Sequence, residues 1–141
     1  MIPLSFDKQS GVLPYKIIEN RLWILLITSQ TTRSWIIPKG YVEPKFSARE
    51  SAELEAFEEA GIIGTMKFLS LGSYRYQKSA EKGGRWCRVH VYPMKIVNMF
   101  DDYPERNTRR RELMPLEDAL SRVANEELRS LIEHFASKNP K

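Results

Sequence analysis

Three glutamates near the middle of the chain constrain its structure and chemistry more than any other feature. Glu55, Glu58 and Glu59 fall in the run Glu-Ala-Phe-Glu-Glu-Ala-Gly-Ile. On an α-helix the positions i, i+3 and i+4 share one face, so these carboxylates repel one another by roughly 0.2–0.5 kcal/mol per pair. Hard divalent cations such as Mg²⁺ bind carboxylate oxygens. The pattern therefore predicts a metal site on a helix, with a solvent-exposed acidic helix face as the alternative interpretation.

The residues around the glutamates predict where this helix begins and ends. Ser47 is a suitable N-cap, and Glu50 three positions later completes a capping box. Gly61 suits the position after the last helical residue, so we expect the helix to end near Ala60. Alanines recur every four residues from Ala48 to Ala60. This stripe of small side chains allows the helix to lie close on a sheet, with the glutamates pointing away from it.

Runs of apolar and alternating residues predict strands before and after this helix. The expected strands cover residues 11–19, 21–28, 35–37, 64–76, 86–98 and 109–114. The second contains the continuous apolar run Leu-Trp-Ile-Leu-Leu-Ile, typical of a strand buried on both faces. Pro93 indicates an edge strand or a bulge, and residues 39–46 are expected to be irregular. Further helices are expected from residue 115 and over 126–135, which indicates an α/β fold with a mixed sheet and helices on both faces.

Length and composition indicate one ordinary globular domain. The chain has 141 residues, of which 42% are hydrophobic and 28% charged, and we expect a single domain over residues 1–141. The N-terminus lacks a signal-peptide pattern, and no apolar stretch is long enough to cross a bilayer. One cysteine, Cys87, cannot form an internal disulfide, so we expect a reducing, cytoplasmic location and no membrane partner.

The charge balance favours anionic partners. The formal net charge is +4 and the sequence pI is about 9.2, which attracts anions over long distances. No helix-turn-helix, zinc-finger or aromatic RNA-binding pattern is present in the sequence, so we do not expect a nucleic acid as the partner. A basic chain with an acidic helix face suits a phosphorylated small molecule that is bridged by a metal ion.

The spacing of residues 40–62 resembles the signature of the Nudix hydrolase family, G-x5-E-x7-R-E-U-x-E-E-x-G-U, in which U is a bulky apolar residue. The positions that match in register are Gly40, Glu55, Glu58, Glu59, Gly61 and Ile62. Phe46 and Leu54 stand where the family has its first Glu and its Arg, and the small Ala56 stands at a bulky position. A fixed spacing over six positions is far more specific than a lone Glu-x-x-Glu-Glu.

The two departures bear on catalytic competence. In the family, the Arg helps to orient a catalytic Glu, and the first Glu belongs to the same polar network. Losing one partner leaves the other unsatisfied, whereas losing both removes this cost. We therefore expect an apolar contact between Phe46 and Leu54, and a loss of stability in Leu54→Arg. Weakened activity, or a phosphate-binding sensor or scaffold in place of an enzyme, is the alternative.

Two outer segments are similar to one branch of the family. Ser-Gly-Val-Leu-Pro-Tyr at residues 10–15 and Trp-Ile-Ile-Pro-Lys-Gly at 35–40 resemble the diphosphoinositol polyphosphate and diadenosine polyphosphate hydrolases. The resemblance implies an α/β/α sandwich and hydrolysis of a phosphoanhydride bond with Mg²⁺ or Mn²⁺. The implied substrate is a polyphosphorylated small molecule, either a dinucleoside polyphosphate or an inositol pyrophosphate.

The resemblance also implies roles for single residues. Glu55, Glu58 and Glu59 would hold the metal with the carbonyl group of Gly40, and Glu112 would bind metal or activate water, unless it is an ordinary surface residue. Glu55 and Glu112 both remain candidates for the general base. Lys39, beside Gly40, is the best candidate for a phosphate contact. Further candidates, each of which is otherwise a solvated surface residue, are Arg33, Arg75, Lys78, Arg88, Arg109 and Arg111. Tyr74 and Tyr76 either stack on a base or pack in the sheet.

Overall fold

A computed structural model describes residue 3 and residues 5–139 of the chain. The main elements, in chain order, are β1 (Asp7–Ile18), β2 (Arg21–Thr28), β3 (Trp35–Ile36), β4 (Lys39–Tyr41), α1 (Ala48–Ala60), β5 (Ile62–Met66), β6 (Gly72–Gln77), η1 (Ala80–Lys82), β7 (Trp86–Met99), β8 (Arg111–Pro115), α2 (Leu116–Arg122) and α3 (Glu126–Ser137). The strands form one eight-stranded sheet with the central order β3-β2-β1-β7-β5. In addition, β4 pairs with β1, β6 with β7, and β8 with β2.

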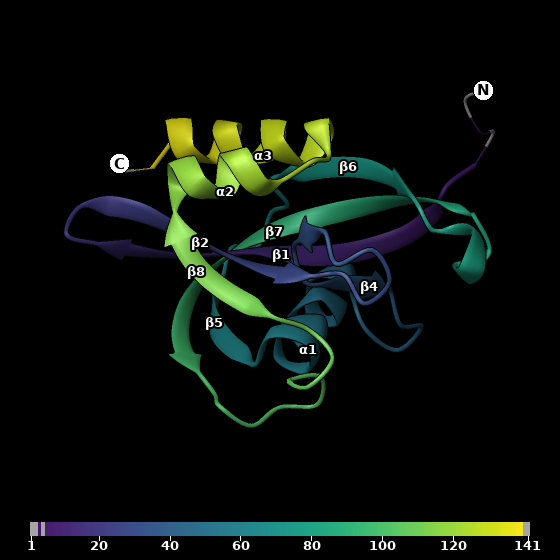
Figure 1. Cartoon of the computed structure of the whole chain (residues 1–141), viewed down its shortest axis with the longest axis horizontal. Helices are drawn as coiled ribbons and strands as arrows, with labels where there is room; N and C mark the ends of the chain where they lie inside the picture. The colour runs from purple at the N-terminus through teal and green to yellow at the C-terminus, as the bar shows by residue number, and fades with distance from the viewer. Residues whose placement is uncertain (1–2, 4, 140–141) are drawn as a thin grey trace.

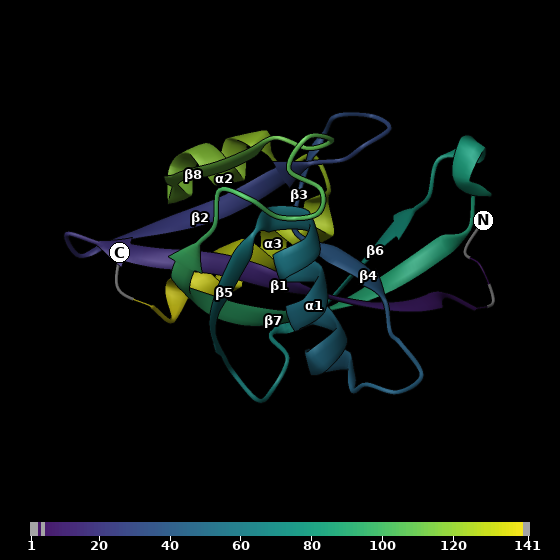
Figure 2. The ribbon, with the colours of Figure 1, turned by 90° about the horizontal axis from the view of Figure 1, so that it is seen from below.

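The sheet is mixed and is covered on both faces. β1 and β7 run parallel from the pair Asp7 and Cys87 to the pair Tyr15 and Lys95, whereas β1 and β2 run antiparallel. In Figure 1, α2 and α3 lie above the sheet and α1 lies below it. Figure 2, seen from below, shows α1 in front of β1 and β7. The predicted α/β sandwich with helices on both faces is therefore confirmed.

The apolar run in β2 faces two hydrophobic cores. Leu22, Ile24 and Leu26 belong to the cluster under α2 and α3. Leu25 and Ile27 belong to the cluster under α1. Because successive side chains of a strand point to opposite faces, a strand between two helical layers needs apolar residues at every position. The prediction of a strand buried on both faces is confirmed.

The predicted caps of α1 are both present. The Ser47 side chain accepts a hydrogen bond from the backbone N–H of Glu50, and the Glu50 side chain accepts one from the backbone N–H of Ser47. Gly61 ends the helix in the left-handed conformation. Ala52, Ala56 and Ala60 are fully buried. The small side chains let α1 pack closely on the sheet, as predicted.

The prediction of one long strand over residues 64–76 is wrong. The chain forms two strands there, β5 and β6, which pair with different halves of β7. Between them, the Lys67 N–H donates to the Pro93 carbonyl group and the Leu71 N–H to the Val91 carbonyl group. The break between β5 and β6 therefore lies opposite Pro93. The expectation that Pro93 marks an edge strand or a bulge is wrong, because β7 is an inner strand and its ladder has no bulge at this residue. Pro93 lies inside β7, with β1 on one side and the gap between β5 and β6 on the other.

Two smaller boundaries also differ from the prediction. Lys39–Tyr41, expected to be irregular, forms β4 and pairs with residues 9–11 of β1. The last strand begins at Arg111 instead of residue 109. Before it, the Thr28 N–H donates to the Arg110 carbonyl group, and the Arg110 N–H donates to the Thr28 hydroxyl group. Strand and side-chain hydrogen bonds together thus hold this segment beside the end of β2.

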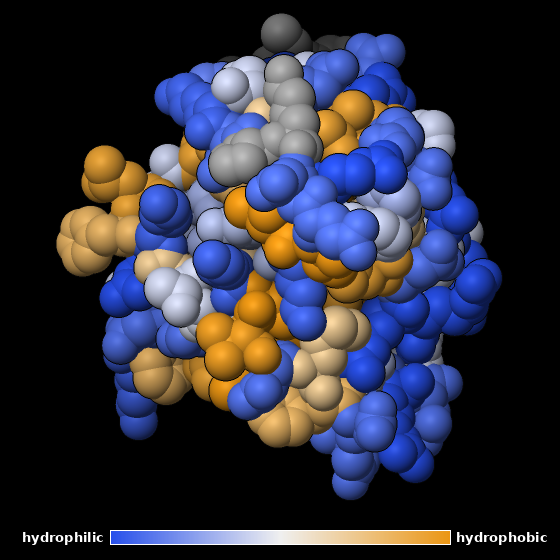
Figure 3. Space-filling model, turned by 90° about the vertical axis from the view of Figure 1, so that its left-hand side faces the viewer, coloured by the Kyte–Doolittle hydropathy of each residue, from blue (hydrophilic) through white to orange (hydrophobic). Residues whose placement is uncertain are grey.

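Apolar side chains are exposed at the end of the sheet formed by β5 and the last residues of β7. Ile63, Val97 and Met99 are 40%, 59% and 36% exposed, and apolar surface is visible on the face that Figure 3 shows. β4 and β6 lie on the opposite side in Figure 1, so this apolar surface is separate from the cavity described below. Among the described residues, no helix is long and apolar enough to cross a membrane.

Gly61 supplies a test of this packing. A Cβ atom there would lie 2.3 Å from Cδ1 of Tyr103, and its φ is +66°. Gly84 has nearly the same φ, +65°, but a Cβ atom there would meet nothing within 4 Å. We expect Gly84→Ala to cost about 1 kcal/mol for the backbone conformation. Gly61→Ala should cost about 1–3 kcal/mol more because the ring must move. Urea denaturation measures both, and equal losses would contradict the packing of Tyr103 on α1.

Candidate functional site

The site is built around Glu59, which is 7% exposed near the C-terminal end of α1. Its Oε1 accepts a hydrogen bond of 3.0 Å from the backbone N–H of Lys39. Its Oε2 lies 3.2 Å from Nη2 of Arg109. Burial raises the pKa of Glu59 most strongly, while Arg109 and Lys39 act in the opposite direction. One carboxylate therefore connects α1 to β4 and to the segment before β8.

Glu55 lies one helical turn earlier on the same face. Its carboxylate lies against Gly40, where an added Cβ atom would come within 2.4 Å of the Glu55 Cδ. A residue with a side chain would displace this carboxylate, which explains the glycine. Burial first, and then the charges of Glu59 and Glu58, raise the pKa of Glu55 to about 8. The raised pKa thus reflects the burial of this carboxylate first and the negative charge of its neighbours second.

Glu105 is an acidic residue of this site that no sequence pattern indicated. Its Oε1 lies 2.8 Å from Nε of Arg109, and its backbone N–H donates to the Glu58 carbonyl group. Its charge also raises the pKa of both Glu55 and Glu59. The residue lies in a polar loop without a recognisable pattern, so only the folded chain brings it to α1.

The carboxylate groups of this site are suitable ligands for a hard divalent cation. Carboxylate oxygens are the ligands such ions prefer, and the unfavourable charge around Glu55 is one that a cation would offset. Across residue 3 and residues 5–139, however, no group of three or more Asp, Glu, His or Cys side chains is arranged to hold a metal. Glu58 is exposed. Glu55, Glu58 and Glu59 stay the candidate ligands on α1, with the backbone of Gly40 against the Glu55 carboxylate.

Glu112 does not join these carboxylates. It pairs with Leu26 across β8 and β2, and Leu26 faces the core under α2 and α3. Its Oε1 lies 3.1 Å from Nη1 of Arg122 on α2. Glu112 thus faces the side of the sheet opposite α1. This position argues against the expected role in metal binding or water activation.

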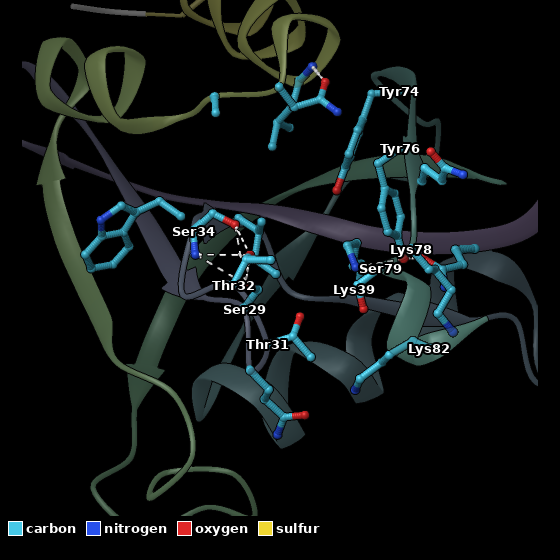
Figure 4. A pocket seen from close by; sticks show the side chains of 18 of the residues that line it. Ser29, Thr31, Thr32, Ser34, Lys39, Tyr74, Tyr76, Lys78, Ser79 and Lys82 are labelled. Carbon is cyan, nitrogen blue, oxygen red and sulfur yellow. Dashed lines mark hydrogen bonds between the residues drawn. The ribbon is translucent and has the colours of Figure 1, made fainter. Parts of the chain in front are cut away.

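A cavity of about 480 Å³ adjoins Glu59. Its volume is within the range of about 300–1,000 Å³ that is typical of small-molecule sites. The lining includes residues of β4, β6, the loop after β2 and the start of α3; among them are Ser29, Thr31, Thr32, Ser34, Lys39, Tyr41, Glu59, Tyr74, Tyr76, Lys78, Ser79, Lys82, Arg109 and Leu128. Figure 4 shows Lys39, Lys78 and Lys82 on one side and the hydroxyl-bearing loop on the other. A ligand in this space would contact both cations and hydroxyl groups.

Lys39, Lys78 and Arg109 are the predicted phosphate-binding residues that line this cavity. Burial lowers the pKa of Lys39 to about 8, although the charge of Glu59 acts to raise it. The Lys39 ammonium group donates to the Tyr76 hydroxyl group at 3.0 Å. Lys82 also lines the cavity and was not predicted, because its position in the turn before β7 carries no sequence signal.

The other four predicted cations have different neighbours outside the cavity lining. Arg33 donates to the Thr108 carbonyl group at 3.0 Å, and Arg111 to the Ala60 carbonyl group at 2.8 Å. Arg75 forms an ion pair with Glu127 of α3. The guanidinium carbon of Arg88 lies 4.8 Å from the centre of the Phe6 ring. These interactions connect parts of the fold, so they argue against direct phosphate contacts in this arrangement.

Phe46 and Leu54 are both exposed, at 45% and 44%. An arginine at position 54 would therefore reach water instead of being buried without a partner. The expected loss of stability in Leu54→Arg does not follow from this arrangement.

Comparisons with known proteins agree with the fold. A family model described as NUDIX domain matches residues 9–135. Nudix hydrolase 12, mitochondrial, from Arabidopsis thaliana is 27% identical over 150 residues, covering 93% of this chain and 73% of that protein. Diphosphoinositol polyphosphate phosphohydrolase 3-beta from Bos taurus is 28% identical over 120 residues, covering 84% and 70%.

A solved structure has the same fold over nearly the whole chain. The binary complex of a C. elegans Ap4A hydrolase has a TM-score of 0.76 at 24% identity, covering 94% of this chain and 96% of that one. The family model spans most of the described strands and helices, including the glutamates of α1. The chain therefore belongs to the NUDIX domain family.

Proposed function

We propose that this protein hydrolyses a phosphoanhydride bond in a polyphosphorylated small molecule, with a divalent cation held by α1. The substrate classes we favour are dinucleoside polyphosphates and inositol pyrophosphates. The main support is one juxtaposition: Glu59, one turn from Glu55, reaches the lining of a cavity that also contains Lys39 and Arg109. Membership of the family supports a pyrophosphohydrolase activity in general.

The chain's own residues fit the parts of such a reaction. Lys39 and Lys78, which line the cavity, would bind phosphate oxygens, and Arg109 would add its positive charge to the cavity wall while Glu59, Glu105 and the Thr28 carbonyl group hold its guanidinium group. Glu55 would accept the proton of the attacking water, since the other candidate for the general base, Glu112, faces the opposite side of the sheet. Mg²⁺ or Mn²⁺, held by the glutamates of α1 with the carbonyl group of Gly40, would neutralise the phosphate charge and lower the pKa of bound water.

The relatives bear on the substrate only by analogy. The bovine relative is named a diphosphoinositol polyphosphate phosphohydrolase, and the C. elegans structure is described as an Ap4A hydrolase. The two names correspond to the two substrate classes that the sequence favoured. At 28% and 24% identity, we carry these classes to this chain as proposals only.

A phosphate-binding sensor without turnover is the second candidate. It is favoured by the absence of the signature's first Glu and Arg at Phe46 and Leu54. The repulsion around Glu55 speaks against it, since a pure binding module does not need a carboxylate whose pKa is raised to about 8. Incubation with Mg²⁺ and a panel of both substrate classes, nucleoside triphosphates, ADP-ribose and capped RNA separates the two. Binding of a panel member without turnover of any of them would favour the sensor.

Substitution of the α1 glutamates tests the proposed machinery. We expect Glu55→Gln and Glu59→Gln to lower kcat about 10²–10⁴-fold on the best panel substrate, because each removes a charge needed for proton transfer or cation binding. Both should also weaken Mn²⁺ binding, measured by electron paramagnetic resonance. Glu53 is an exposed residue of the same helix, so Glu53→Gln is the matched control and should leave both kcat and Mn²⁺ binding unchanged. Unaltered turnover in Glu59→Gln would exclude our assignment.

The raised pKa of Glu55 predicts a pH-dependent stability without metal. An unfolded glutamate releases its proton near 4.5, whereas folded Glu55 keeps it up to about 8. Between these values the folded state binds more protons than the unfolded state, so the free energy of unfolding should fall as pH rises. Thermal melting in EDTA from pH 4.5 to 8.5 should show a steeper fall for wild type than for Glu55→Gln.

Metal addition provides the complementary measurement. At pH 8, Mg²⁺ should raise the melting temperature of wild type more than that of Glu55→Gln, because a ligand that binds only the folded state stabilises it. If the melting temperatures of the two proteins in EDTA fell in parallel as the pH rises, Glu55 would not be the group whose pKa is raised.

A further inference from the structure

Two lysines of the cavity are held by tyrosine side chains and not by carboxylates. Nζ of Lys39 donates to the Tyr76 hydroxyl group at 3.0 Å, and Nζ of Lys78 donates to the Tyr41 hydroxyl group at 3.1 Å. The same nitrogen atoms lie 4.1 Å and 4.7 Å from the centres of the Tyr76 and Tyr41 rings, and the face of an aromatic ring attracts a cation. All four residues line the cavity.

The two contacts are exchanged between strands. Lys39 and Tyr41 both belong to β4, whereas Tyr76 belongs to β6 and Lys78 directly follows it. Because residues two positions apart on a strand face the same side, each strand brings one lysine and one tyrosine to the cavity. Figure 4 shows Lys39, Tyr76 and Lys78 close together on one side of it. Each lysine is therefore held by the strand that does not carry it.

Each tyrosine hydroxyl group donates in turn to an acceptor on β1. The Tyr76 hydroxyl group donates to Oε1 of Gln9 at 2.8 Å, and the Tyr41 hydroxyl group donates to Oδ2 of Asp7 at 3.1 Å. An ammonium group can only donate, so each hydroxyl group accepts from its lysine and has its own hydrogen left for another acceptor. This order requires the oxygen of the Gln9 amide, and not its nitrogen, to face Tyr76.

These hydrogen bonds hold the lysines without neutralising them. Gln9 is uncharged, and Asp7 is paired with Arg85, whose Nε lies 2.7 Å from Oδ2 of Asp7. Over residue 3 and residues 5–139, neither Lys39 nor Lys78 forms an ion pair. A carboxylate in place of either tyrosine would cancel the charge of its lysine, whereas a hydroxyl group leaves that charge for a ligand.

Positive charge prevails in the described lining of the cavity. Lys39, Lys78, Lys82 and Arg109 stand there against one carboxylate, Glu59. That carboxylate accepts from the Lys39 backbone N–H through Oε1, and its Oε2 is paired with Arg109. An anionic ligand would therefore be stabilised between the two lysine ammonium groups.

We infer that Tyr76 and Tyr41 are positioning residues, which hold Lys39 and Lys78 by these hydrogen bonds and leave both ammonium charges to the phosphate groups of the ligand. This inference rests on the proposed function, because it concerns the residues that would contact the phosphates. A lysine side chain has many rotamers, and fixing it before the ligand arrives lowers the entropy that binding costs. The two tyrosines thus add to affinity by acting through the lysines.

Calorimetric titration with inorganic tripolyphosphate in EDTA measures phosphate binding without metal-dependent turnover. We expect Tyr76→Phe and Tyr41→Phe, which keep the ring and remove the hydroxyl group, each to weaken binding about three- to tenfold. Tyr15 is 6% exposed in the core and does not belong to the cavity lining, so Tyr15→Phe is the matched control and should bind as wild type does. Unchanged or tighter binding in either of the first two variants would overturn the inference.

The exchange between strands allows a sharper test with double variants. If Tyr76 acts through Lys39 alone, Tyr76→Phe has no further effect in Lys39→Met but keeps its full effect in Lys78→Met. Tyr41→Phe should show the opposite pattern, with no further effect in Lys78→Met and a full effect in Lys39→Met. A general structural role, or a direct contact of the tyrosine with the ligand, would instead give equal losses in both backgrounds.

Nuclear magnetic resonance relaxation of the lysine side chains provides a readout that does not depend on binding. Order parameters of the lysine Cε groups report motion on the picosecond to nanosecond timescale. Without ligand, Tyr76→Phe should lower the order parameter of Lys39 and not that of Lys78, and Tyr41→Phe should do the reverse. Order parameters that equal those of wild type would overturn the positioning role, even where a lysine variant binds tripolyphosphate too weakly to titrate.

Hydrolysis assays separate this inference from the proposed function. The expected pattern in tripolyphosphate binding, without hydrolysis of any substrate in the Mg²⁺ panel, would support the positioning role and reject the proposed activity. Hydrolysis together with equal losses in both lysine backgrounds would support the activity and reject the positioning role. A wild-type protein that does not bind tripolyphosphate would reject the inference, whatever it hydrolyses.

Discussion

The ion pair between Glu59 and Arg109 is the interaction on which the candidate site depends. The two side chains are 9% and 11% exposed and their charged atoms lie 3.2 Å apart. Removing one partner of such a pair leaves the other charge buried, which typically costs about 3–5 kcal/mol. Arg109 also donates to the Thr28 carbonyl group and to Glu105. The pair therefore joins α1, the end of β2 and the segment before β8 around one edge of the cavity.

The sheet explains why the carboxylates and the cavity can meet. Lys39 pairs with Gly11, and Gly40 pairs with Ser10. Because neighbouring residues of a strand face opposite sides, the Lys39 side chain points to the cavity while Gly40 faces α1. Glu59 of α1 reaches the lining of the same cavity, and its carboxylate accepts a hydrogen bond from the Lys39 N–H.

The departures from the family signature have a specific structural context. Phe46 and Leu54, which stand where the signature has its first Glu and its Arg, are almost half exposed. The two substitutions therefore lie on the protein surface and not in a core. The cation that contacts Glu59 comes instead from Arg109, fifty residues further along the chain. The orientation of this carboxylate therefore does not require an arginine at position 54. For this reason we regard the acidic site as compatible with catalysis despite the altered signature.

The sequence by itself determined the local features of this protein. Caps, alanine spacing and apolar runs defined α1 and β2, because hydrogen bonds and side-chain periodicity within a few residues decide them. The spacing of Glu55, Glu58 and Glu59 likewise placed them together on α1. Their assignment to metal binding rests on this spacing and on the family resemblance, and it stays a prediction.

Only the tertiary structure decided which distant residues join the site. Glu105 lies beside the α1 carboxylates, whereas Glu112 faces α2, and nothing in their local sequence distinguishes the two. The gap between β5 and β6 opposite Pro93 was also missed, since it depends on how one long strand pairs with two others. Long-range pairing sets these positions, and local propensity carries no information about it.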